Sequence, residues 1–367
     1  MSLEQKMEAF RKAVPVVYLD ERKILDPTAP DASTRIVNGE SSNALDWNNV
    51  RLPWVYPMYK TLLANFWTPF EINLTHDIKD FANLELHEKE AFLSIYSLLR
   101  ALDSMQTDYI MRTADYYTDS SIVALLAIVD QQEVVHNQSY DTIKAAVATL
   151  AEQEFSNNVW KTMPTLLERN EFISKGYDRA IKEATLDMLI QSLIYDVVLE
   201  GIFFYAGFAF FYDLMRNGKM VAAGTMINYI NRDEQQHVRI FTEIYKQILI
   251  DFPEFDVPEL KELGTEILRE AANLEIAWAN EIIGDKFATI DSEELAGYVR
   301  FMANVRAKQL QLPTPFERQE TNPMSWIKVY EDTDMGKTDF FEQKVRNYKK
   351  ASEGFNDVDS LNEGDLL

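Results

Sequence analysis

The chain has no cysteine among its 367 residues. A disulfide framework, a thiolate metal site and a cysteine nucleophile are therefore excluded. Any reaction that needs protein thiols must obtain them from another protein. The N-terminal residues also lack the uninterrupted apolar core of a signal peptide, which together with the missing cysteines predicts a cytoplasmic protein.

Basic residues are scarce compared with acidic ones. The 36 Lys and Arg against 59 Asp and Glu leave a formal charge of −23. That charge repels phosphate groups and argues against binding to nucleic acid or to an anionic membrane. One apolar stretch, residues 193–215, is long enough to suggest a membrane span. Asp196 and Glu200 interrupt it, and carboxylates are costly in lipid, so a helix at the centre of a large bundle is favoured.

Glycine and proline are also few, with 12 of each, and alternating strand patterns are nearly absent. Helical periodicity covers most of the chain instead. The predicted helices span residues 88–116, 119–150, 177–216, 219–251, 258–283 and 292–311. We therefore predict an all-α fold.

The length allows one large domain or two smaller ones. We assign residues 1–331 to a single helical domain, with an N-terminal extension over about the first 50 residues. Residues 332–367 are polar and charged and end in two leucines. This composition predicts a flexible acidic tail and not a further helix of the bundle.

One short motif, Glu-x-x-His, occurs twice, at Glu133 and His136 and again at Glu234 and His237. A spacing of three places both side chains on one helix face, where they can bind the same metal ion. A single match is weak in so acidic a chain. Two matches among only four histidines, on separate helices, are much stronger. Both pairs lie on apolar stripes, where a metal cation compensates a buried carboxylate.

Asp103 and Glu200 are two further carboxylates on apolar helix faces, each on the helix before one of the motif helices. The repeated order matches the di-iron and di-manganese bundles of the ferritin-like fold. The resulting set is rich in oxygen and offers one imidazole per ion, which suits Fe or Mn. The predicted ligands are Asp103, Glu133, His136, Glu200, Glu234 and His237. The remaining histidines, His76 and His87, receive no role.

Tyr140 lies one helical turn beyond His136 on the same face, about 5 to 6 Å away at Cβ. A reduced metal pair exposed to oxygen or a reduced oxygen species can make a strong one-electron oxidant, and Tyr140 is placed to be oxidised by it. Phe204 and Phe208 are expected to shield such a radical. Taken alone, a tyrosine such as Tyr140 is more often a core residue with a bonded hydroxyl.

With these motifs, the chain resembles the small, radical-generating (beta) subunit of class I ribonucleotide reductase. The resemblance extends from about Trp54 to the C-terminus and includes "NFWTPFEINLTHD", "LLRALDSMQ", "EVVHNQSY", "LEGIFFYAGFAF" and "INRDEQQH". It implies the same six metal ligands and a radical at Tyr140. It also implies that Trp67 and Asp233 link the metal site to the surface through His136, and that Tyr348 relays the electron to a partner.

The resemblance implies partners as well. A large (alpha) subunit would supply the cysteines that the reduction of a ribose hydroxyl requires, and the C-terminal residues, with Leu366 and Leu367, would dock in a groove of it. A homodimer is expected, and relatives that use manganese need a flavodoxin-like activating protein. The native metal, and whether Tyr140 holds a lasting radical, stay open.

Three other functions fit parts of the pattern. A ferritin-class ferroxidase uses a similar bundle, but it is normally shorter and needs no relay tryptophan. A di-metal oxidase would act on an organic substrate and would need a ligand pocket at the metals. An inactive scaffold is disfavoured because all six ligands are present.

Overall fold

The computed structural model describes residues 1–331, in which Met1–Ser325 form one compact helical unit. The start of a second unit contains the end of the 3₁₀ turn Ser325–Ile327 and the short helix α13 (Lys328–Glu331). The predictions for the tail 332–367, including Tyr348, Leu366 and Leu367, lie outside the described residues.

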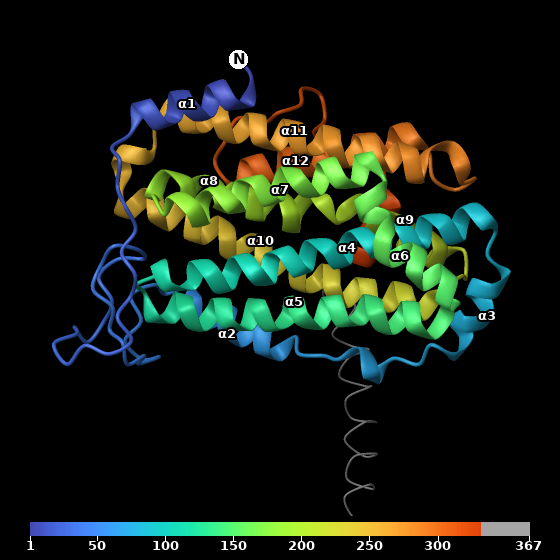
Figure 1. Ribbon diagram of the computed structural model, residues 1–367, viewed down its shortest axis with the longest axis horizontal. Coiled ribbons are helices and arrows are strands. Elements are labelled where there is room, and N and C mark those ends of the chain that lie inside the picture. Colours follow the sequence, from blue (N-terminus) through green and yellow to red (C-terminus); the bar gives the residue numbers. More distant parts are fainter. Residues whose placement is uncertain (332–367) are drawn as a thin grey trace, which may run out of the picture. The chain divides into compact units, whose positions relative to one another are not determined.

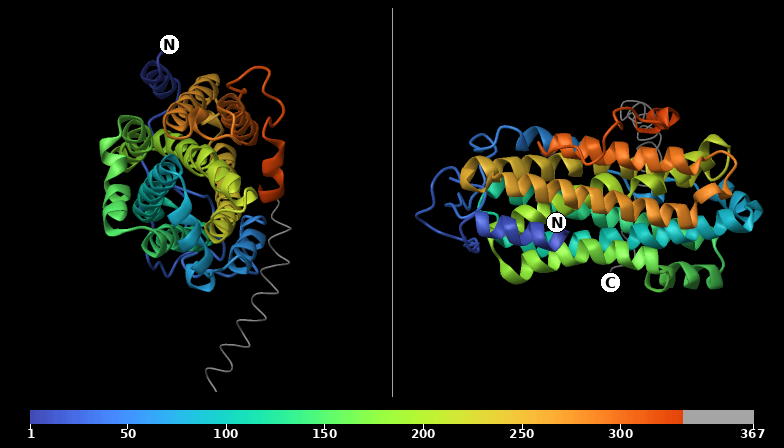
Figure 2. Two further views of the ribbon diagram at one scale, coloured as in Figure 1. Left: turned by 90° about the vertical axis from the view of Figure 1, so that its right-hand side faces the viewer. Right: turned by 90° about the horizontal axis from the view of Figure 1, so that it is seen from above.

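Long helices that pack side by side form the centre of this unit (Figure 1). The central helices are α4 (Leu86–Thr113), α5 (Ser120–Val147), α8 (Leu186–Val198), α9 (Tyr205–Arg216) and α10 (Val221–Asp251). α8 and α9 are joined by a short π-helical segment, Leu199–Phe203, which we call the π turn. Seen along the helix axes, the helices of the unit form a bundle (Figure 2).

The remaining helices cover this centre. They are α1 (Leu3–Ala13), α2 (Val55–Ala64), α3 (Thr75–Asn83), α6 (Leu150–Thr162), α7 (Pro164–Glu183), α11 (Pro258–Ile282) and α12 (Ser292–Gln309). Short 3₁₀ turns occur at Pro69–Glu71, Ala114–Tyr116, Pro253–Phe255 and Gly284–Lys286. Residues 1–331 contain isolated β-bridges but no strand, so the predicted all-α fold is confirmed.

Several predicted helix ends coincide with capping groups. The Asp119 carboxylate accepts the backbone N–H groups of Ser121 and Ile122 at the start of α5. Asp291 does the same for Glu294 at the start of α12. These side chains satisfy backbone donors that a helix N-terminus leaves unpaired. The sequence therefore sets these boundaries locally.

The prediction of one helix over residues 177–216 was wrong. α7 begins earlier and ends at Glu183, because Ala184 adopts a left-handed conformation with φ of 48° and ψ of 46°. The carbonyl of Ala184 accepts the N–H of Leu19, and the N–H of Leu186 donates to Val17. The N-terminal segment thus satisfies the backbone groups that the break exposes.

The apolar stretch is a core element. Leu186–Arg216 is long and apolar enough to cross a membrane, but its most apolar stretch of 18 residues is entirely buried inside the protein. Asp196 and Glu200 within it are fully buried as well. Burial in the bundle accounts for its composition, as the two carboxylates had suggested.

Candidate metal centre

The structure brings all six predicted ligand residues together in the core. Asp103 comes from α4, Glu133 and His136 from α5, Glu200 from the π turn, and Glu234 and His237 from α10. All six side chains have no exposed surface. Helical spacing explains this convergence, because each Glu-x-x-His pair occupies one helix face.

The donor atoms form two groups that share Glu133, and each group is compact enough to hold a metal ion. One group contains Asp103, Glu133 and His136, and the other contains Glu133, Glu200, Glu234 and His237. Glu234 reaches between the two imidazoles: its oxygens lie 3.0 Å from Nδ1 of His136 and 2.8 Å from Nδ1 of His237. Glu133 also approaches Nδ1 of His237, at 2.8 Å. The six residues therefore offer two overlapping donor groups, each able to hold one ion.

The donor set fits divalent cations. Both oxygens of each of the four carboxylates, and Nδ1 of each histidine, are buried without a hydrogen-bond partner. Burial, and after it the nearby Glu133, raise the pKa of Asp103 and of Glu200. Burial also disfavours the charge on Glu234, but the two histidines hold the pKa of that carboxyl below its usual range. Buried polar atoms almost always form hydrogen bonds, so this many unbonded oxygen and nitrogen atoms around one point indicate a cation site.

A second layer of side chains fixes both histidines. Nε2 of His136 donates to Oδ2 of Asp233 at 3.4 Å, and Nε2 of His237 donates to Oε1 of Gln132 at 3.0 Å. With these N–H groups bonded, each Nδ1 presents its lone pair to the cluster. Asp233 directly precedes Glu234 but bonds the histidine of the first motif, and Gln132 directly precedes Glu133 but bonds the histidine of the second. This reciprocal arrangement is visible in the sequence as "QEVVH" and "DEQQH". Gln132 was missed because the sequence does not show which helices face each other.

Asp233 also binds the indole of Trp67. Nε1 of Trp67 donates to the same Oδ2 at 2.8 Å, and the indole is only 3% exposed. The guanidinium of Arg232 holds the other oxygen, Oδ1, at 3.2 Å. A continuous chain of hydrogen bonds therefore runs from Trp67 through Asp233 to His136, and its role as a relay stays a prediction.

Tyr140 is buried beside the cluster, and its hydroxyl has no hydrogen-bond partner. Burial, and after it the charge of Asp103, raise the pKa of this phenol well above its usual value. Its aromatic neighbour is Tyr96 of α4, with ring centroids 5.5 Å apart. Phe204 and Phe208 stack on each other at 5.6 Å, and their expected contact with Tyr140 stays a prediction.

A further buried polar group, which sequence reasoning did not find, adjoins the cluster. Asp196 lies one helical turn before Glu200 and accepts hydrogen bonds from Tyr177 at 2.7 Å and from Gln106 at 3.2 Å. Burial raises the pKa of Asp196 to about 8. The ring of Tyr177 stacks on that of Tyr109 at 3.9 Å. This group forms only through contacts between helices, so no local sequence motif predicts it.

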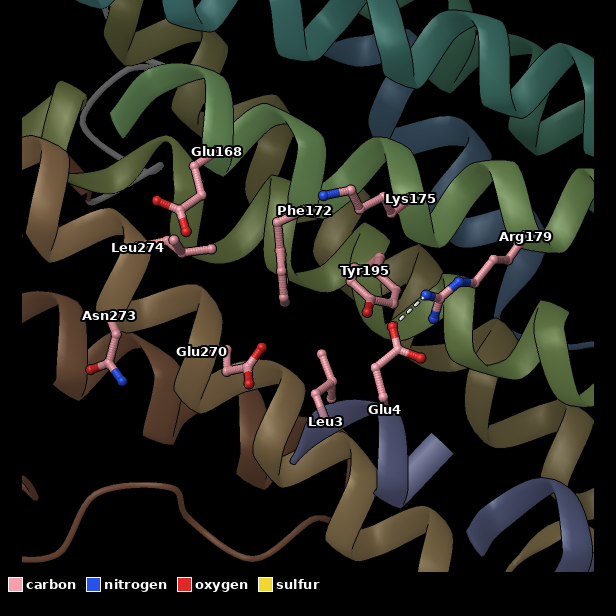
Figure 3. Close-up of a pocket in the computed structure, with 10 residues that line it drawn as sticks. All are labelled: Leu3, Glu4, Glu168, Phe172, Lys175, Arg179, Tyr195, Glu270, Asn273 and Leu274. Carbon is pink, nitrogen blue, oxygen red and sulfur yellow. Dashed lines mark hydrogen bonds and ion pairs between the residues drawn. The ribbon is translucent and has the colours of Figure 1, made fainter. Parts of the chain in front are cut away.

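Five cavities on the described part of the chain are lined by residues other than the six predicted ligands. One of about 460 Å³ opens between α1, α7, α8 and α11, and a 2.7 Å ion pair between Glu4 and Arg179 crosses it (Figure 3). Phe172 and Tyr195 form its apolar wall. None of the six ligand residues lines this cavity or the four others that we find. The pocket that a substrate oxidase would need is absent from all five.

Fold and site together define an all-α protein of the ferritin-like class with a carboxylate and histidine cluster in its core. Comparison with known proteins gives the family. The family model for "Ribonucleotide reductase, small chain" matches residues 44–323. The chain belongs to this family, which confirms the resemblance to the small subunit of class I ribonucleotide reductase.

Individual relatives agree over nearly the whole length. The chain is 52% identical to the ribonucleoside-diphosphate reductase subunit beta of Halalkalibacterium halodurans over 342 residues, 93% of this chain and 99% of the relative. Its fold matches the ribonucleotide reductase R2 subunit from Clostridium botulinum with a TM-score of 0.83 and 32% identity, covering 86% of this chain and 99% of that one. The dimanganese(II)-NrdF of Streptococcus sanguinis shares the fold, with a TM-score of 0.68 and 22% identity over 78% of this chain and 98% of that one.

By this membership the activity is that of ribonucleoside-diphosphate reductase, in which a small subunit works with a large one. The absence of cysteine agrees with this division. The primary prediction of function is thereby confirmed. The alternatives, a ferroxidase or an oxidase acting without a large subunit, are not supported.

Proposed function

We propose that Asp103, Glu133, His136, Glu200, Glu234 and His237 bind two ions of iron or manganese, and that the centre generates an oxidising equivalent for the large subunit. The observation that carries this proposal is the set of buried carboxylate oxygens and imidazole nitrogens without hydrogen bonds. Burying such a set is costly unless cations neutralise it. The Streptococcus sanguinis relative is described as a dimanganese protein, which supports a pair of ions and leaves iron and manganese as alternatives.

Glu133 belongs to both donor groups, so its carboxylate would help to hold both ions. His136 belongs to one group and His237 to the other, so each histidine would hold one ion. When bound and oxidised, the metal pair supplies a one-electron oxidant. The protein surrounds it with a dry core, in which electrostatic interactions are stronger than in water.

We assign Tyr140 as the residue that holds the oxidising equivalent. Loss of one electron and of the hydroxyl proton from Tyr140 gives a neutral phenoxyl radical. The side chain is 1% exposed, so water and solutes are excluded from it. Shielding of this kind prevents side reactions and prolongs the life of a reactive group.

The oxidising equivalent passes to the large subunit through His136, Asp233 and Trp67, while the electron moves the opposite way, from the partner toward Tyr140. If Trp67 is oxidised, its indole proton can move along the 2.8 Å hydrogen bond to Asp233, so that charge does not accumulate on the ring. The same carboxylate oxygen holds the N–H of His136. Tyr348 would continue the path, and it lies beyond the described part of the chain.

The proposed partners are the large subunit, a second copy of this chain and, with manganese, a flavodoxin-like activator. The proposed location is the cytoplasm.

Removal of residues 332–367 is expected to abolish nucleotide reduction with the large subunit, because the proposed docking residues Leu366 and Leu367 and the proposed relay residue Tyr348 are lost. Both metal ions should still bind, since every ligand residue is retained. Metal content and nucleotide reduction, measured on the same preparation, test this expectation. Full activity of the shortened chain would contradict docking through the tail.

The metal is identified by metal analysis combined with electron paramagnetic resonance after aerobic activation, with and without a flavodoxin-like protein. Two ions per chain and an organic radical signal are expected. Iron activated by oxygen alone, or manganese activated only with the helper, identifies the subclass. A protein that binds fewer than two ions per chain would contradict the proposed centre.

A further inference from the structure

The π turn is the irregular element of the core, and it carries Glu200. A π turn is bonded from residue i to residue i+5, so it holds one residue more than an α-helical turn and shifts the register of the helix after it. All of Leu199–Phe203 is buried. Backbone carbonyls that lose their helical donor here cannot turn to water and need partners within the protein.

Arg306 of α12 supplies one partner. Its Nε donates to the carbonyl oxygen of Gly201 at 3.0 Å, and Nη2 donates to the hydroxyl of Tyr205 at 2.7 Å. A Cβ atom added to Gly201 would lie 2.4 Å from Nε of Arg306. Glycine at this position therefore allows the guanidinium to reach the backbone.

Arg169 of α7 supplies the second partner. Its Nη2 donates to the carbonyl oxygen of Phe203, and its guanidinium stacks over the Phe203 ring at 4.0 Å. Nε of Arg169 pairs with Glu275 of α11 at 2.6 Å. The other oxygen of Glu275 accepts the N–H of Ala206 at 3.3 Å, where α9 begins.

Three covering helices therefore converge on this one segment. α7, α11 and α12 lie on the same side of the centre as α8 (Figure 1). Arg169 has no exposed surface and Arg306 is 5% exposed. Arginine is rarely buried, because removing its charge from water is costly unless its donors are used. Here donors of both residues bond the backbone of the turn that bears a ligand residue.

We propose that Arg306 and Arg169 are positioning residues that hold the π turn open, so that the Glu200 carboxylate faces the second metal position. This inference rests on the proposed function, because it presupposes two bound ions. Without the guanidinium groups, the carbonyls of Gly201 and Phe203 would lose these partners, and a return to α-helical bonding would compensate for the loss. That change of register rotates Glu200 away from His237, whose Nδ1 now lies 3.8 Å from its carboxylate.

The test is anaerobic binding of Mn(II) to the full chain, measured as ions per chain and as affinity. Arg306→Ala removes the donor, and Gly201→Ala displaces it by a different route. We expect both variants to lose affinity at one of the two positions, by about tenfold or more, the range typical for residues that support metal ligands. Arg306→Lys retains one donor for the Gly201 carbonyl and should recover most of the binding.

The control is Arg216→Ala, which removes a donor to the backbone carbonyl of Thr289 at the far end of α9. It should bind two ions with unchanged affinity. Circular dichroism establishes that each variant is folded; if Arg306→Ala is not, Gly201→Ala and Arg306→Lys carry the comparison. Two ions bound with native affinity in the folded Arg306 and Gly201 variants would overturn the inference. If the unaltered chain itself fails to bind two ions, the proposed function fails instead.

Discussion

Tyr140 and Tyr96 are adjacent buried tyrosines, and neither hydroxyl has a hydrogen-bond partner. Only Tyr140 follows a Glu-x-x-His motif by one helical turn. We expect Tyr140→Phe to abolish the radical signal and nucleotide reduction while two metal ions still bind, because the phenol is the proposed site of oxidation and is not among the proposed ligands. Electron paramagnetic resonance and metal analysis of the same sample measure both.

Tyr96→Phe is the matched control for this change. It removes an unbonded hydroxyl from the neighbouring ring and should leave the radical in place. If Tyr140→Phe reduced nucleotides at the native rate, the metals themselves would store the oxidising equivalent and the assignment of Tyr140 would be wrong.

Asp196 gives the core a pH dependence. Its pKa rises with burial from 3.8 to about 8, so between these values the folded chain holds a proton that the unfolded chain has released. Folding therefore becomes less favourable as pH rises through this window, by at most about 1.4 kcal/mol per pH unit. Asp196→Asn can still accept the bond from Tyr177 but does not titrate. Denaturation of the metal-free proteins at pH 5 and pH 7.5 should show the native chain losing stability relative to the variant.

The exposed Asp108 of α4 is the control for this titration. Asp108→Asn alters a surface carboxylate, and its stability should follow that of the native chain at both pH values. Parallel pH dependences of the native chain and of Asp196→Asn would refute the role given to Asp196.

At this scale the sequence yields residues that share a helix face and misses those that meet across helices. Glu133 and His136 follow from spacing alone, and the second copy of the motif makes the assignment specific. Gln132 bonds a histidine on another helix, and Tyr177 bonds an aspartate on another helix. Polar pairs of this kind depend on which helices are neighbours, which the spacing of residues within one helix does not specify.

At the scale of elements, the break between α7 and α8 falls at Ala184, which adopts the left-handed conformation. For an alanine this conformation costs about 1–2 kcal/mol, whereas glycine adopts it without that penalty. We expect Ala184→Gly to stabilise the protein by about 0.5–1 kcal/mol after the extra backbone entropy of glycine is subtracted. Chemical denaturation measures the change.

Ala145 provides the opposite case, because it is an exposed residue inside α5. Ala145→Gly should destabilise the protein by about 0.5–1 kcal/mol, since glycine weakens an ordinary helix. Destabilisation by both substitutions would mean that Ala184 is not strained.

The break at Ala184 and the π turn both lie within the one helix predicted over residues 177–216, and they have the same physical origin. Residues 177–216 contain neither proline nor a glycine at the break, so periodicity continues through it. The break is stabilised by backbone bonds to the N-terminal segment, and the π turn by arginines of α7 and α12. Helix existence follows from local apolar spacing, whereas these irregularities depend on distant residues.

At the scale of the whole molecule, the metal centre places several carboxylates close together in the core. Four carboxylates and two histidines share one buried volume, in a chain that already carries a charge of −23. Repulsion among these carboxylates opposes folding when metal is absent. The centre therefore couples the stability of the bundle to its metal content.

This coupling predicts opposite effects of Asp103→Asn with and without metal. Without metal, the amide relieves the burial of a carboxylate that has no hydrogen bond, and the variant should be more stable than the native chain by about 1–3 kcal/mol. With metal, the native chain should gain about 2.7 kcal/mol for each site at a metal concentration of 100 times its dissociation constant. The variant should gain less, because one ligand is lost. Thermal denaturation with Mn(II) and with a chelator should therefore reverse the order of the two proteins, and an unchanged order would contradict a metal site that includes Asp103.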